Sequence, residues 1–110
     1  MLQKNSLNIF LIFIVFHLSI WTLIPSLSNI NLPLDTIEHL AWSTNISLGY
    51  SKHPPMIAVV LNFFYNFFKS NDWAYYFLSQ LFIVISFIYV WMLSQEILKD
   101  KVLSLLSVLI

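Results

Sequence analysis

The side chains that could take part in chemistry gather in one polar segment, residues 35–56, which lies between long apolar stretches. The segment opens with two carboxylates, Asp35 and Glu38, and a basic pair, Lys52 and His53, comes near its end. A carboxylate can take the proton from an incoming hydroxyl or stabilise positive charge at a sugar carbon. A lysine ammonium can neutralise a departing phosphate. The two kinds of group together are suited to sugar transfer from a lipid-linked phosphate, with Asp35 and Glu38 as the candidate catalytic residues.

A short helix over residues 35–48 is expected to position the acidic end of this segment. Four side chains fall on one side of it, at the spacing i, i+3, i+4 and i+7: Asp35, Glu38, His39 and Trp42. Gly49, the single glycine of the chain, is suited to the left-handed residue that ends such a helix. Two consecutive prolines follow, so residues 50–55 are expected to be extended.

The acidic and basic residues also have structural explanations. Asp-x-x-Glu before a helical pattern is a capping box, in which Asp35 would be the N-cap and Glu38 would lie at N3. Lys52 could be a solvated loop cation near lipid head groups. These explanations compete with the chemical ones, because a carboxylate that caps a helix has fewer oxygen lone pairs left for a substrate.

His53 offers two further alternatives. Its ring could simply pack on Pro54 or Trp42. It could also complete a divalent metal site with Asp35 and His39, whose i, i+4 spacing lets two ligands converge from one helix. A metal is therefore an open alternative, and no cofactor is firmly predicted.

The composition indicates a membrane protein. The 110 residues are 59% hydrophobic and 9% charged, whereas ordinary soluble domains carry about 25% charged residues. Residues 7–24 form an apolar run that would be about 27 Å long as a helix, close to the ~30 Å hydrocarbon core. A cleavable signal peptide is the alternative, although its apolar region would span only about 7–15 residues. Within this run, His17 is a functional candidate, but we favour a neutral imidazole bonded to a neighbouring helix.

A second span is predicted over residues 74–93, which carry no charge and are flanked by the tyrosines and tryptophans typical of membrane interfaces. Residues 25–34 are expected to form a loop, and residues 57–68 are too few to cross a bilayer, so they predict an interfacial helix. A third apolar run begins at residue 102 and is expected to be a truncated span. The predicted fold is an all-α integral membrane protein with two transmembrane helices, the start of a third, and an outer loop, residues 25–73, with short interfacial helices.

The lysines indicate how the chain crosses the membrane. Lys4 precedes the first span, and Lys99 and Lys101 follow the second, so all three can lie in the cytoplasm. The loop 25–73 then lies on the outer side, which is the periplasm for a bacterial inner membrane, although two lysines also fall within it. The zero net charge argues against nucleic acid as a partner, because phosphate backbones require a basic excess.

The order of these features resembles the N-terminal part of family-39 glycosyltransferases, the bacterial relatives of protein O-mannosyltransferases and of the lipid A aminoarabinose transferase. The resemblance covers about residues 7–93. It is carried by Asp35, Glu38, Trp42 and the Gly-Tyr-x-Lys-His-Pro-Pro string of residues 49–55. Such proteins open with one span, followed by an outer loop with an acidic motif on a short helix, a Lys-Pro-Pro type element and a membrane-surface helix.

The resemblance implies a polyprenyl-phosphate sugar as the donor and a lipid or a protein as the acceptor. It implies that Asp35 is the essential acidic residue and that Lys52 approaches the donor phosphate. We predict that the side chains of Asp35 and Lys52 face a common cavity at the outer membrane surface. Glu38 is matched less directly, because many relatives have adjacent Asp-Glu, whereas two residues separate the carboxylates here. The other candidate substrate-binding residues are Tyr50, His53 and Trp42.

Family members have many spans and a carbohydrate-facing outer domain near the C-terminus, and residues 1–110 contain neither. We therefore expect an N-terminal membrane segment of a larger glycosyltransferase fold, inactive alone, which belongs to a split reading frame or is completed by a second chain. The alternative from another class is a small non-enzymatic membrane protein that binds a partner through its spans.

Overall fold

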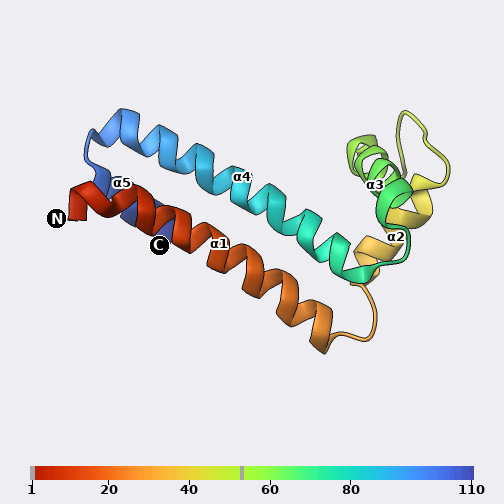
Figure 1. The fold of residues 1–110 in the computed structure, drawn as a ribbon. Helices are drawn as coiled ribbons and strands as arrows, with labels where there is room; N and C mark the ends of the chain where they lie inside the picture. Colours follow the sequence, from red (N-terminus) through yellow and green to blue (C-terminus); the bar gives the residue numbers. More distant parts are fainter. Residues whose placement is uncertain (1, 53) are drawn as a thin grey trace.

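The described part of the protein consists of helices and short connections. The computed structural model describes residues 2–52 and 54–110, the side chains of residues 2–4 excepted. The helices, coloured along the chain in Figure 1, are α1 (Leu2–Ser28), α2 (Leu34–Ser43), α3 (Pro55–Phe68), α4 (Asp72–Leu98) and α5 (Lys101–Leu109). The predicted all-α fold class is confirmed.

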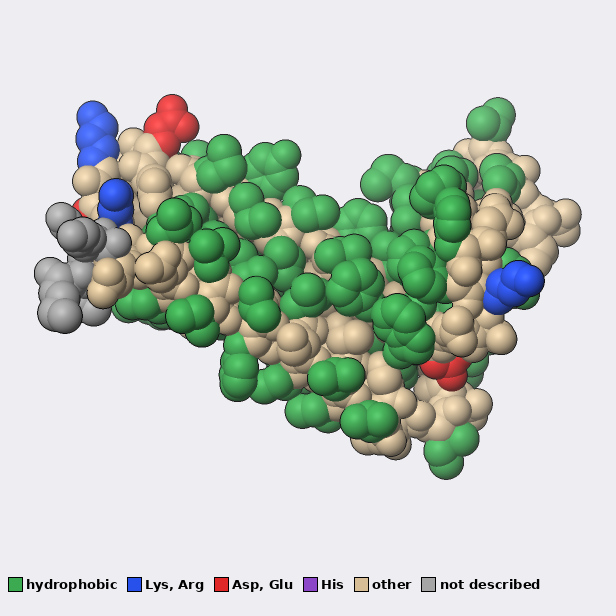
Figure 2. Space-filling model, viewed as in Figure 1, with side chains coloured by type: hydrophobic (Ala, Val, Ile, Leu, Met, Phe, Trp, Pro, Cys, Tyr) green, Lys and Arg blue, Asp and Glu red, His purple; other side chains and the backbone are tan. Residues whose placement is uncertain are grey.

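Two of these helices are long and apolar enough to cross a membrane. They are Asn5–Ser28 within α1 and the whole of α4, 24 and 27 residues respectively. Only 17% and 6% of their most apolar stretches are buried inside the protein, whereas the core helix of a soluble domain would be covered. On the face shown in Figure 2, charged side chains lie at the two ends and apolar side chains cover much of the region between them. The two predicted transmembrane helices are confirmed.

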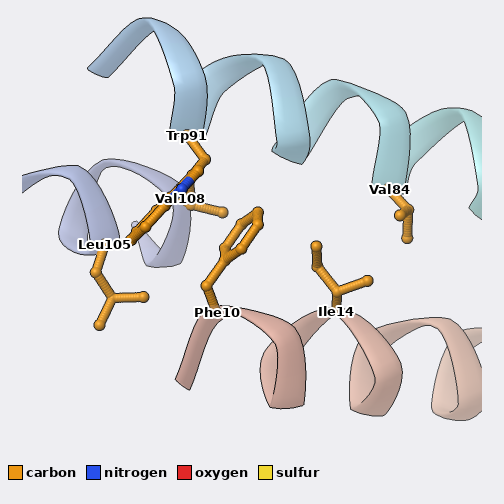
Figure 3. Close-up of a cluster of buried hydrophobic side chains, with 6 residues drawn as sticks. All are labelled: Phe10, Ile14, Val84, Trp91, Leu105 and Val108. Atoms are coloured by element: carbon orange, nitrogen blue, oxygen red, sulfur yellow. The ribbon is translucent and has the colours of Figure 1, made fainter. Parts of the chain in front are cut away.

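α1, α4 and α5 form a three-helix bundle. α1 and α4 run antiparallel, and α5 turns back against both (Figure 1). Six buried side chains meet in its core, drawn in Figure 3: Phe10, Ile14, Val84, Trp91, Leu105 and Val108. The rings of Phe10 and Trp91 stack with centroids 4.6 Å apart and planes 14° apart. Close packing matters here because lipid is as apolar as a leucine side chain, so burial alone does not hold membrane helices together.

The turn between α4 and α5 is defined by Lys99 and Asp100. Lys99 ends α4 in the left-handed conformation, with φ of 51°. The Asp100 carboxylate then caps α5, because its Oδ1 accepts the backbone N–H groups of Val102 at 2.7 Å and Leu103 at 3.1 Å. The third apolar run therefore forms a helix that begins at Lys101, one residue before the predicted start.

α1 continues through Pro25 to Ser28, where the sequence predicted a loop. Pro25 has no N–H to donate to the carbonyl of Trp21, but its own carbonyl accepts the N–H of Asn29 at 3.0 Å. The hydroxyls of Ser26 and Ser28 also bond to carbonyls four residues earlier. A proline near the end of a helix costs one hydrogen bond, and these contacts offset it.

His17 packs through its ring. It lies against Phe13 and Trp21 of α1, and it meets Phe87 of α4 edge-on at 5.1 Å. Its Nε2 atom is buried and forms no hydrogen bond within the described protein. Nε2 therefore does not form the hydrogen bond to a neighbouring helix that was expected of the His17 imidazole, and the ring makes aromatic contacts with that helix instead.

α2, α3 and the loop between them form a second body, the α2–α3 unit, beyond one end of the α1–α4 pair (Figure 1). α3 begins two residues earlier than predicted, with Pro54 as N-cap and Pro55 in the first turn, where the missing N–H has no helical partner anyway. Figure 1 looks nearly along α3 but across α1 and α4, so α3 lies at a steep angle to both. This orientation fits a helix in the membrane surface, and that location stays a prediction.

Candidate functional site

α2 carries the acidic residues of the candidate site, and it begins earlier than a capping box requires. Pro33 is the N-cap, and its carbonyl accepts the N–H of Ile37 at 3.1 Å. Asp35 therefore lies inside the first turn, no side chain caps the helix, and the capping box with Glu38 is not formed. The Asp35 carboxylate is exposed at the positive end of the helix dipole. Neither carboxylate is used to start the helix.

An ion pair joins the acidic and basic ends of the polar segment. Lys52 Nζ lies 3.1 Å from Glu38 Oε1, and the two side chains are 64% and 37% exposed. Lys52 thus pairs with the second carboxylate of α2. Among the described residues no hydrogen bond or ion pair involves the Asp35 carboxylate, which was predicted to share a cavity with Lys52. An exposed pair contributes at most about 1 kcal/mol to stability, so separating the two side chains costs little. Because both side chains are exposed, a ligand can reach either partner.

Aromatic rings from α2 and from the following loop pack together at the C-terminal half of α2. The rings of Trp42 and Tyr50 stack with centroids 5.3 Å apart and planes 8° apart, and His39 packs edge-on against Trp42 at 5.4 Å. The Tyr50 hydroxyl is within donating distance of the carbonyls of Asn45 (2.8 Å) and Trp42 (3.1 Å), and it accepts the N–H of Ser47 at 3.3 Å. Tyr50 therefore attaches the loop to the C-terminal end of α2.

α2 ends at Ser43 rather than near residue 48, and Gly49 is not its left-handed cap. Thr44 keeps a right-handed conformation, and Gly49 has no positive φ. Side chains donate hydrogen bonds to the last carbonyls of α2 instead. The donating side chains are those of Ser43, Thr44, Tyr50 and Asn62. The glycine prediction was wrong because these side chains supply the bonds that a left-handed glycine usually provides.

The chain after Tyr50 bends at Ser51 and Lys52 instead of staying extended as predicted. Tyr50 stacks on Trp42 and Lys52 pairs with Glu38, and these contacts with α2 explain the difference. His53 lies outside the described residues, so its predicted packing and substrate contact stay predictions. Within residues 2–52 and 54–110, no group of three His, Cys, Asp or Glu side chains could hold a metal ion. The predicted metal site included His53 and is therefore not tested.

An apolar cavity of about 330 Å³ lies beside the acidic helix. α2 contributes Thr36 and His39 to its wall. The other lining residues are Met56, Ile57, Val60 and Leu61 of α3 and Tyr75, Leu78, Ser79 and Phe82 of α4. The mostly apolar lining is suited to a hydrocarbon chain. The sequence predicted an interfacial helix over residues 57–68 but gave no sign that α4 would complete the cavity wall, because no local pattern says which helices pack together.

Comparison with protein families shows a match over the second half of the chain. The family described as dolichyl-phosphate-mannose-protein mannosyltransferase matches residues 52–110, more than half of the 110 residues. The match begins at Lys52 and includes the parts of α3 and α4 that line the cavity, whereas Asp35 and Glu38 precede it. Comparisons with curated proteins and with solved structures gave no match.

Proposed function

Since the chain belongs to the dolichyl-phosphate-mannose-protein mannosyltransferase family, we propose that it forms the donor side of a glycosyltransferase site. The donor would be a polyprenyl-phosphate sugar, and the acceptor a lipid or a protein. The observation that carries this proposal is the exposed ion pair between Glu38 of α2 and Lys52 of the following loop, together with the apolar cavity that α2 borders. The pair supplies an acid and an ammonium, and the cavity can receive a hydrocarbon tail.

Lys52 would bind the donor phosphate by exchanging its partner. Its side chain is 64% exposed, so a lipid phosphate can reach the ammonium without displacing packed side chains. Charge-assisted hydrogen bonds from lysine to phosphate are strong. When the ammonium moves to the phosphate, the Glu38 carboxylate loses its cation and becomes free to accept a proton from an acceptor hydroxyl.

In the proposed transfer, the acceptor oxygen bonds to the anomeric carbon of the sugar as the bond from that carbon to the donor phosphate breaks. The acceptor proton goes to a carboxylate, and the polyprenyl phosphate leaves with the bonding electrons. Lys52 stabilises the charge on the leaving phosphate. Asp35, one turn before Glu38, is the second proposed catalytic residue, and the further proposed donor-site residues are Trp42 and His53.

We place the α2–α3 unit on the outer face of the membrane, the periplasmic face of a bacterial inner membrane, with the N-terminus in the cytoplasm. In support, Lys99 and Lys101 lie at the opposite end of the bundle from the α2–α3 unit (Figure 1). The chain has no cysteine, so Ser47→Cys and Lys101→Cys can each be labelled singly. In intact cells an impermeant thiol reagent should label only the first, and labelling of only the second would overturn this orientation.

We further propose that residues 1–110 act as the N-terminal membrane segment of a larger glycosyltransferase fold. Glu38 and Lys52 are open to solvent, and α2, α3 and α4 border one side of a donor. The other side and the acceptor site would come from further protein, in the same chain or in a second one. The segment by itself is expected to bind the donor without transferring sugar.

The test is photo-crosslinking of a polyprenyl-phosphate probe to the protein in lipid nanodiscs. Lys52→Gln should lower labelling about 10- to 100-fold, since a hydrogen bond to a charged group is worth about 1.5–3 kcal/mol. Lys69→Gln is the matched control, because Lys69, the residue directly after α3, is also an exposed lysine and forms no ion pair among the described residues. Equal labelling of the parent and Lys52→Gln would instead favour a non-enzymatic membrane protein that binds a partner through its spans.

A further inference from the structure

We propose that Tyr50 is a positioning residue that fixes the loop after α2 in the register that brings Lys52 to Glu38. Tyr50 would thus act through Lys52 rather than by contacting the substrate. The functional meaning of this inference rests on the donor-site role proposed for Lys52. The structural part concerns only how the loop is held, and it can be tested separately.

The hydroxyl of Tyr50 is occupied by the backbone at the end of α2. Its oxygen lies 2.8 Å from the carbonyl oxygen of Asn45 and 3.1 Å from that of Trp42, and it accepts the N–H of Ser47 at 3.3 Å. A phenol has one proton to donate and lone pairs to accept with. With two carbonyls and one N–H around it, this hydroxyl has no donor left for a sugar or a phosphate.

The ring of Tyr50 is occupied on the side that faces α2. It stacks on Trp42 with only 8° between the planes, and Trp42 is in turn packed against His39. Stacked aromatic pairs add to stability beyond the area that they bury. The hydroxyl and the ring together therefore fix both the position and the orientation of Tyr50 on the helix.

This attachment sets the register of the loop against the helix. Glu38 precedes Trp42 by four residues, which is about 6 Å along an α-helix. Lys52 follows Tyr50 by two residues, and two residues of chain reach at most about 7 Å. Anchoring Tyr50 at Trp42 therefore brings Lys52 to the helical turn that carries Glu38, where the 3.1 Å pair is found.

The ion pair is too exposed to hold the loop by itself. Lys52 and Glu38 are 64% and 37% exposed, and such pairs contribute little to stability. The contacts of Tyr50 do not involve Lys52, so they persist when the ammonium leaves Glu38 for a phosphate. The loop would stay in place during donor binding because it is held at one residue and binds through another.

The absence of cysteine makes a cross-linking test direct. The double variant Glu38→Cys/Lys52→Cys in nanodiscs removes the ion pair and reports the separation of the two positions through a short bifunctional thiol reagent. Adding Tyr50→Ala should slow cross-linking at least tenfold, and Tyr50→Phe, which keeps the stack but loses the hydroxyl, should slow it about threefold. Leu48→Ala is the matched control, because the Leu48 side chain in the same loop is fully exposed, and it should leave the rate unchanged.

A second pair reports whether the rest of the fold is intact. Asn29 and Tyr76 lie together, with Asn29 Nδ2 3.0 Å from the Tyr76 hydroxyl. Asn29→Cys/Tyr76→Cys should therefore cross-link at the same rate in the parent and after either Tyr50→Phe or Tyr50→Ala. The proposal would be overturned if positions 38 and 52 cross-linked at the parent rate in both Tyr50 variants. It would also be overturned if Leu48→Ala slowed their cross-linking as much as the Tyr50 variants do. If Tyr50→Ala also slows the second pair, Tyr50→Phe decides: slowing confined to positions 38 and 52 supports positioning, and slowing of both pairs or of neither overturns it.

The donor probe separates this inference from the proposed function. If cross-linking responds to Tyr50 but Lys52→Gln leaves probe labelling unchanged, the positioning role stands and the donor site fails. If Lys52→Gln abolishes labelling while the cross-linking rate ignores Tyr50, the donor site stands and the positioning role fails. If the positioning role and the donor site are both correct, Tyr50→Phe should lower probe labelling by the same factor as it slows cross-linking.

Discussion

The bundle and the α2–α3 unit are held together by different kinds of contact. In the bundle, six buried apolar side chains from three helices meet in one core, with the Phe10–Trp91 stack at its centre. In the α2–α3 unit only Ser43, Ala58 and Leu61 are buried within the helices. There, the connections are hydrogen bonds of Asn62 and Tyr50, one exposed ion pair and stacked rings.

The difference separates stability from chemistry. Packed apolar contacts resist opening, whereas regions with few buried contacts and exposed hydrogen bonds open at lower free energy. The groups that could act on a donor all belong to the less buried region. A substitution there should therefore change binding or transfer with little effect on the bundle, and a substitution in the bundle core should do the reverse.

The largest expected effect is on transfer. Glu38→Gln in the assembled enzyme should lower sugar transfer about 100- to 10,000-fold, the usual contribution of a positioned acid or base. The stability of the bundle should stay unchanged, because the Glu38–Lys52 pair is exposed. Transfer from a polyprenyl-phosphate sugar is the measurement, and Glu96→Gln, an exposed carboxylate near the end of α4, is the control. Full activity of Glu38→Gln would assign the catalytic carboxylate elsewhere.

The next largest effect is expected on the stability of the bundle. Trp91→Ala should lower the free energy of unfolding by about 3 kcal/mol, because it removes a stacked ring and leaves a cavity. Unfolding in a mixed detergent titration measures this loss. Met92→Ala, whose side chain is 59% exposed on the same helix, should cost far less. Equal losses for the two variants would mean that the core of Figure 3 does not carry the stability of the bundle.

A smaller effect is expected inside the α2–α3 unit. Asn62→Ala removes the bond to the carbonyl of Ser43, and a part-buried carbonyl left unpaired costs about 1 kcal/mol. Hydrogen exchange of the last turn of α2 should then speed up about fivefold, while exchange within α1 stays the same. Asn66→Ala, an exposed asparagine on the same helix, is the control. Faster exchange throughout α1 would show that the two regions open together.

The smallest effect compares two lysines with positive φ. Lys99 ends α4 at φ 51°, and Lys69 follows α3 at φ 48°. Glycine relieves that backbone strain but also gives the unfolded chain more freedom, so the net gain is about 0.5 kcal/mol. Lys99→Gly should raise the stability of the bundle by this amount. Lys69→Gly should slow only local opening of the α2–α3 unit, and an equal rise in bundle stability for both would contradict separate opening.

The sequence allowed the bundle to be predicted better than the site. Uninterrupted apolar runs identify spanning helices because lipid requires them, and both spans and the start of the third helix are confirmed. The ends were less accurate: α1 passes Pro25, since one lost hydrogen bond near a helix end is tolerated. The predicted end of α2 was also wrong, because side chains bond to its last carbonyls and Gly49 does not cap the helix.

The pairing within the site could not be read from spacing. Asp35 and Lys52 were predicted to face a common cavity, but the structure pairs Lys52 with Glu38. That choice depends on where Tyr50 rests on α2, which involves the backbone of Asn45 and Ser47 as well as the ring of Trp42. Contacts between residues this far apart leave no periodic signal.

Because a proline removes a backbone hydrogen bond, we expect α1 to bend most readily near Pro25. The turn between Trp21 and Pro25 lacks one backbone hydrogen bond of the helix. The packed core around Phe10 lies several turns away, toward the N-terminal end of α1. Flexing at that turn would tilt the loop that follows while the helices anchored in lipid keep their alignment. Since membrane spans adapt to bilayers of different thickness by tilting or bending, we expect α1 to adapt at Pro25 while the core contacts of the bundle stay in place.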